Sequence, residues 1–152
     1  MRLTAEQLGQ CAQVRTMCAS NQLRRASRGM THAYDAAMGD SGLKVTQLPI
    51  LVALGSAGDL PVTALAGALG LDRTTLTRNL RVLEARGLVC TVAHPDDARV
   101  RLVSLTPEGS DVLAGALARW ADAQARVEER FGAERLRALY DELAALSDAV
   151  SA

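Results

Sequence analysis

Arginine and threonine side chains recur at helical spacing along "DRTTLTRNLRVLEARG", residues 72–87. An arginine can donate two hydrogen bonds to one guanine, and a threonine can contact a phosphate or a thymine methyl group. These residue types on one helical face predict contacts with duplex DNA, made by Arg73, Thr74, Thr75, Thr77, Arg78 and Arg81. Alternatively, Arg78 and Arg81 are surface charges that only keep the chain soluble.

A second group of charged residues lies in the turn "HPDDAR", residues 94–99. Arg99 at the tip of a hairpin would reach a minor groove of DNA, where the negative potential attracts arginine. Arg101, one strand alternation further on, would touch phosphate or simply point outward. The alternative for the whole turn is that Asp96 and Asp97 form an Asx-type turn and Arg99 is solvated.

Two short helices in tandem would position the first group. The segment 61–70 has Pro61 near its start and Gly70 as its stop. The next helix opens at Asp72, whose side-chain oxygens can cap it. Its inner face is a row of leucines, Leu76, Leu80 and Leu83. Helices joined this tightly have the geometry of a helix-turn-helix.

Two short strands would position the second group. Residues 88–93 and 100–105 are rich in β-branched side chains and flank the charged turn. Thr106, Pro107 and Glu108 then start a helix, with a capping hydroxyl, a proline at the first position and an acid in the first turn. The predicted fold is mainly α with a small β-hairpin wing, a winged helix-turn-helix.

Longer helices flank this unit. One helix is predicted from residue 5 to about residue 38, and the helix after it would be capped by Thr46, with Pro49 in its first turn. The helix from Pro107 to Gly132 should bury Val112, Leu113, Ala116, Leu117, Trp120, Val127 and Phe131. The last helix carries a narrow seam suited to packing against another helix, of this chain or of a second subunit, formed by Leu136, Leu139, Leu143, Leu146 and Val150.

The composition limits the class of protein. The 152 residues make one domain-sized unit, and 49% apolar with only 3% aromatic residues favours a helical core. Residues 1–60 and 61–105 each carry six basic and four acidic side chains, whereas residues 106–152 carry five basic and nine acidic ones. A phosphate-facing surface is therefore permitted in the first two-thirds of the chain, although the net charge is zero.

Several classes of protein are not indicated. The start of the chain has no apolar signal core, and the longest apolar stretch, about ten residues, is too short to cross a bilayer, so we expect a cytoplasmic protein. Enzyme chemistry has no support, because there is no Ser/His/Asp grouping, glycine-rich phosphate loop or set of converging carboxylates. The two histidines and three cysteines lack metal-ligand spacing, and no cofactor is expected.

Cys11 and Cys18 could form a redox site. They lie seven residues apart, or about 10 Å along one straight helix, whereas a disulfide needs Cα atoms within about 7 Å. They would therefore pair only across a dimer or with another thiol. The alternative is that both are small apolar residues in a buried seam, and Cys90 in the first strand is interpreted as packing.

The chain resembles the MarR family of bacterial transcription regulators over nearly its whole length. The resemblance rests on "LAGALGLDRTTLTRNLRVLEARGLV" and on "DDARVRLVSLTPEG", in which Asp97, Arg99, Thr106 and Gly109 match the family's wing pattern. It implies that Arg99 is the minor-groove residue of the wing tip and that Asp97 is its ion-pair or turn partner.

The resemblance also implies a mode of action. Such proteins are typically homodimeric repressors on pseudo-palindromic operators, released by a phenolic ligand or by cysteine oxidation. We therefore expect dimerisation elements in residues 1–40 and 106–152 and a DNA-binding core in residues 41–105, within one structural domain. Family members that sense organic hydroperoxides carry a reactive cysteine in the first helix, which keeps a thiol switch as an alternative. An alternative of another class is a protein-interaction module that does not bind DNA.

Overall fold

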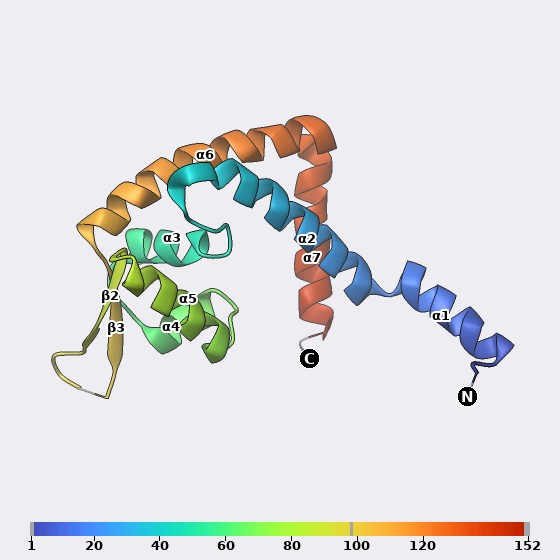
Figure 1. Ribbon diagram of the computed structural model, residues 1–152, viewed down its shortest axis with the longest axis horizontal. Helices are drawn as coiled ribbons and strands as arrows, with labels where there is room; N and C mark the ends of the chain where they lie inside the picture. The colour runs from blue at the N-terminus through green and yellow to red at the C-terminus, as the bar shows by residue number, and fades with distance from the viewer. Residues whose placement is uncertain (1, 98, 151–152) are drawn as a thin grey trace.

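The computed structural model describes residues 2–97 and 99–150. Helices make up most of this part of the chain, and a small sheet projects at the end of the molecule opposite the N-terminal helix (Figure 1). The elements, in chain order, are α1 Ala5–Met17, α2 Ala19–Met38, the 3-10 turn η1 Gly39–Ser41, α3 Leu48–Ala57, β1 Leu60–Pro61, α4 Val62–Ala68, α5 Arg73–Ala85, β2 Val89–Ala93, β3 Arg101–Leu105, α6 Pro107–Phe131 and α7 Ala133–Val150. This is the predicted winged helix-turn-helix with long flanking helices.

The core lies between α3, α4, α5, the sheet and the first half of α6. Its most deeply buried side chains are aliphatic, among them Ile50, Leu51, Leu54, Leu65, Leu76, Leu83, Leu88 and Val103. The row of leucines predicted for α5 is buried in this core. Because α5 is anchored by that row, its arginines are left on the surface.

Two predicted caps fix the start of α5 and of α6. Asp72 Oδ1 accepts a hydrogen bond from the backbone nitrogen of Thr75 at 2.9 Å. The Thr106 hydroxyl accepts one from the nitrogen of Gly109 at 2.9 Å and donates to the carbonyl of Gly87 at 2.6 Å. Thr106 therefore joins the start of α6 to the segment between α5 and β2.

The wing contains a strand that the sequence did not predict. The two-residue strand β1 pairs antiparallel with β3, Leu60 opposite Val103, so the sheet order is β1-β3-β2. Pro61 lies at the edge of the sheet, where a missing N–H is tolerated, and occupies the N-cap position of α4. A two-residue strand shows no alternation, so only the pairing with β3 reveals it.

The predicted single helix over residues 5–38 is wrong. Cys18 is extended, with φ −69° and ψ 112°, and separates α1 from α2. Two polar side chains just after the break donate hydrogen bonds to carbonyls that lose their helical partners. Asn21 donates to the carbonyl of Val14 at 3.2 Å, and Gln22 donates to that of Thr16 at 2.9 Å. Polar side chains of this kind compete with helical hydrogen bonds. Cys11 and Cys18 therefore do not lie on one straight helix.

The cap predicted for α3 is also wrong. Gln47, not Thr46, is the N-cap residue, and its side-chain oxygen accepts a hydrogen bond from the nitrogen of Lys44 at 3.0 Å. Pro49 lies in the first turn as predicted.

Several residues expected to be buried on α6 are exposed in the single chain, and so is most of the seam of α7. On α6, Leu113 and Ala116 are buried, but Leu117, Trp120 and Phe131 are exposed and Val112 and Val127 are intermediate. On α7, Leu136 is buried and the rest of the seam is exposed. The reason is geometric: α6 has 25 residues and extends beyond the core, and α7 follows from its far end (Figure 1).

A polar junction holds the three long helices together. The Tyr34 hydroxyl on α2 donates to Gln124 Oε1 on α6 at 2.5 Å, and the Gln124 amide donates to Glu128 and to the Tyr140 hydroxyl on α7. Burial raises the pKa of Tyr34, and the neighbouring Tyr140 and Glu128 raise it further. Among the described residues, no helix is long and apolar enough to span a membrane.

Candidate DNA interface

The outer face of α5 forms the first half of the candidate interface. Arg73, Thr74, Arg78 and Arg81 are exposed on it. All four, with Thr77, line an open hollow of about 450 Å³. Five of the six residues predicted on this helix therefore share one surface, and Thr75 lies outside it.

The other two threonines of this helix are engaged within it. The Thr75 hydroxyl donates to Asp72 Oδ2 at 2.6 Å, and the Thr77 hydroxyl donates to the carbonyl of Arg73 at 2.7 Å. The hydrogen bond from the Thr75 side chain, followed by that from its backbone, lowers the pKa of Asp72. With their protons committed, both hydroxyls can act toward a ligand only as acceptors.

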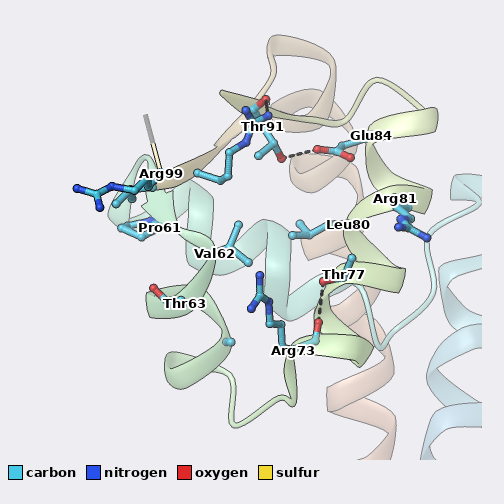
Figure 2. A pocket seen from close by; sticks show the side chains of 13 residues that line it. Pro61, Val62, Thr63, Arg73, Thr77, Leu80, Arg81, Glu84, Thr91 and Arg99 are labelled. Carbon is cyan, nitrogen blue, oxygen red and sulfur yellow. Dashed lines mark hydrogen bonds between the residues drawn. The ribbon is translucent and has the colours of Figure 1, made fainter. Parts of the chain in front are cut away.

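The wing forms the second half. Asp97 Oδ1 accepts hydrogen bonds from the backbone nitrogen of Arg99 at 3.0 Å and from its Nε at 3.2 Å. Asp97 is therefore both the turn partner and the ion-pair partner of Arg99, as the wing pattern led us to expect. The Arg99 side chain is 93% exposed and points away from α5 (Figure 2).

Between the two halves lies a groove of about 730 Å³ (Figure 2). Residues 61–63, at the junction of β1 and α4, form part of its wall. Arginines from both predicted groups line it: Arg73, Arg81, Arg99 and Arg101. The fold therefore brings together two groups of arginines that are separated in the sequence, on a surface suited to a polyanion.

Three further residues shape this surface, and the sequence reasoning missed their roles. Glu84 on α5 accepts a hydrogen bond from the Thr91 hydroxyl on β2. Arg86, just after α5, donates to the carbonyls of Gly42 at 2.7 Å and Ser41 at 2.9 Å, which fastens the end of the helix to a distant loop. No local pattern marks these contacts, because each partner lies on a different element.

Known proteins share this arrangement. The MarR family profile matches residues 41–100. The transcriptional regulator MosR of M. tuberculosis, solved in complex with DNA, is 37% identical with a TM-score of 0.76, over 87% of this chain and 97% of that one. The chain belongs to the MarR family.

Two other relatives of this MarR-family chain are regulators as well. BpsR of Bordetella bronchiseptica, whose DNA binding is regulated by 6-hydroxynicotinic acid, is 28% identical with a TM-score of 0.73, over 86% of this chain and 93% of that one. The HTH-type transcriptional regulator YdgJ of Bacillus subtilis is 27% identical over 119 residues, 73% of this chain and 68% of that protein. The MarR-family chain is thus a DNA-binding transcriptional regulator and not an enzyme.

The cysteines of the MarR-family chain are free thiols: Cys11 and Cys90 are exposed, and Cys18 is half-buried at the break between α1 and α2. Within residues 2–97 and 99–150, no three histidine, cysteine or acidic side chains gather closely enough to hold a metal ion.

Proposed function

We propose that this MarR-family regulator is a homodimeric repressor that binds a pseudo-palindromic operator through α5 and the wing. The groove lined by four arginines from both elements carries the proposal. In the proposed complex, α5 enters the major groove with Arg73, Thr74, Thr75, Thr77, Arg78 and Arg81. The wing, with Asp97, Arg99 and Arg101, follows the backbone into the adjacent minor groove. Repression in the cytoplasm would follow from covering the promoter.

The exposed apolar side chains of the flanking helices support the dimer. The seam of α7 beyond Leu136 is exposed, and α1 buries no residue while exposing Leu8, Val14 and Met17. Apolar rows on long helices are stabilised by packing against another helix. We therefore assign dimerisation to residues 1–40 and 106–152, and DNA binding to residues 41–105.

Release by a small effector completes the proposal. The two copies of α5 must match half-sites about one helical turn of DNA apart, so a ligand that changes their separation lowers affinity. The regulation of BpsR by 6-hydroxynicotinic acid supports an aromatic acid or a similar small molecule as the effector class.

Oxidation of a thiol is the second candidate for release, favoured by the exposure of Cys11 and by the position of Cys18 at a helix break. Peroxide should then release DNA from the wild type but not from the responsible Cys→Ser variant. Equal release from Cys11→Ser, Cys18→Ser and wild type would exclude these thiols.

A binding titration tests whether the protein binds duplex DNA through α5. The probe is the duplex upstream of the chain's own gene, and the affinity should fall steeply with salt because bound phosphates release counterions. Arg78→Ala should weaken binding by roughly 1–3 kcal/mol if it reads a base, or reduce the salt slope by about 1 if it contacts a phosphate. Arg137→Ala on α7 removes the same charge and serves as the control. A flat salt response, with Arg78→Ala unchanged, would favour a protein-interaction module instead.

A further inference from the structure

Thr91 connects the two halves of the DNA interface. Its hydroxyl donates to Glu84 on α5, and its carbonyl accepts a hydrogen bond from Arg101 Nη2 at 2.9 Å (Figure 2 shows the contact with Glu84). Arg101 is paired across the strands with Ala93, so its side chain reaches back along the wing to bond Thr91. One residue of β2 thus contacts both α5 and an arginine of the wing.

Glu84 has an unusual environment for a carboxylate. Of the described residues that line the groove, it is the only acidic one, and Arg73, Arg81, Arg99 and Arg101 line the groove with it. Among the described residues, however, its hydrogen-bond partner is Thr91 and no arginine pairs with it. A free carboxylate there would repel DNA phosphates, so its presence calls for a structural reason.

The position of the contact along the wing supplies that reason. β1 pairs with β3 at Leu102 and Val103, so it supports the wing from the β3 side. Thr91 lies opposite Val103, and the β2 residues beyond it, Val92 and Ala93, are exposed. A two-stranded ribbon is only marginally stable alone. The hydrogen bond from Thr91 to Glu84 therefore restrains β2 and, with it, the part of the wing that carries Arg99 and Arg101.

We propose that Glu84 and Thr91 are positioning residues that set the separation between α5 and the wing, and thereby select the DNA that both can contact at once. This inference rests on the proposed function, because it assumes that α5 and the wing bind one duplex together. It gives Glu84 a role in specificity that outweighs its unfavourable charge.

Two pairs of variants test the link. Glu84→Gln and Glu84→Ala both remove the charge, but only Glu84→Ala removes the acceptor. Thr91→Ser keeps the hydroxyl that Thr91→Val replaces with a methyl group of the same shape. The probes are a duplex selected by the wild type from a random library and a scrambled duplex of the same composition.

The proposal predicts a loss of specific binding only. Thr91→Val and Glu84→Ala should bind the selected duplex about 5- to 10-fold more weakly than Thr91→Ser and Glu84→Gln, respectively. Within each pair, the affinity for the scrambled duplex should be equal. If only the charge of Glu84 mattered, Glu84→Ala and Glu84→Gln would bind equally well, and both would bind both duplexes more tightly than the wild type. Equal affinities within each pair on the selected duplex overturn the proposal.

Hydrogen exchange in the free protein separates this proposal from the proposed function. Amides of β2 and β3 toward the wing tip should exchange faster in Thr91→Val and Glu84→Ala than in their partners. If the wild type selects no duplex, the proposed function fails and hydrogen exchange still tests the link. If it selects one, and neither exchange nor affinity differs within the pairs, only the link fails. Should Thr91→Val not fold, the Glu84 pair decides.

Discussion

One carboxylate oxygen of Asp97 accepts two hydrogen bonds from Arg99, at 3.0 Å from its backbone nitrogen and at 3.2 Å from its Nε. The first bond closes the turn, and the second orients a guanidinium group that is almost fully exposed. An exposed ion pair of this kind adds only about 0–1 kcal/mol to stability. Its effect is therefore to orient Arg99 at the wing tip before DNA is bound.

Replacing Arg99 should weaken operator binding without changing the fold. Arg99→Ala is expected to lose roughly 1–3 kcal/mol of binding free energy, measured by fluorescence anisotropy with a labelled operator. Asp97→Asn keeps the oxygen that closes the turn and removes a negative charge, so it should bind at least as tightly as the wild type. Wild-type affinity in Arg99→Ala would mean that the wing tip does not contact DNA.

Gly109 should not tolerate a side chain. A Cβ there would overlap the carbonyl oxygen of Leu88 and crowd Leu105, both part of the wing base. Gly109→Ala is therefore expected to lower the free energy of unfolding by about 3 kcal/mol or more, measured by urea denaturation. Gly115→Ala, on the same helix with open space around it, should instead raise it by about 0.5–1 kcal/mol. Similar effects of the two changes would contradict the close contact.

Acid should weaken the start of α5. The pKa of Asp72 lies below its ordinary value of 3.8, because Thr75 donates to it. A carboxyl group with a lowered folded pKa contributes stability that is fully present above pH 3.8 and is lost as the pH falls through the folded pKa. Asp72→Asn keeps an acceptor that cannot titrate, so the wild type should lose stability relative to it only in acid, in urea titrations at a series of pH values. A pH-independent difference would count against this cap.

A charge in the seam of α7 should separate the subunits. Leu143→Glu places a carboxylate in the proposed interface, where burial without a partner is costly, and the variant should be monomeric by light scattering. Ala145→Glu carries the same charge on the other side of α7 and should stay dimeric. A monomeric wild type, or a dimeric Leu143→Glu, would show that this seam does not join two subunits.

Local sequence signals predicted the elements that position the candidate interface. The caps at Asp72 and Thr106 act within one turn of their own residues, so the sequence contains all of the information that places them. The leucine row of α5 likewise depends only on helical spacing. Since these signals position α5 and the wing, Arg73, Arg81, Arg99 and Arg101 line one groove.

Features that depend on distant partners were not predictable. The strand β1 exists only because Leu60 meets Val103, and Arg86 is held by carbonyls more than forty residues earlier in the chain. The break at Cys18 is stabilised by side chains competing for backbone carbonyls, which spacing rules ignore. The exposure of Leu117, Trp120 and Phe131 on α6 was not predictable, because an apolar stripe does not reveal how far a helix extends beyond the core.

The hydrogen bond from Thr106 to Gly87 couples the orientation of α6 to that of α5. The helix begins where α5 and the wing meet, and its 25 residues extend for about 37 Å to the region shared with α7. Because Thr106 joins it to the segment that follows α5, a tilt of α6 would move α5 and the wing together. A tilt of about 5° over that length would move α5 and the wing by about 3 Å, close to the rise of one base pair. In the proposed dimer, a contact far from the DNA would thus need only a small angular change to move α5 and the wing out of register with their half-site.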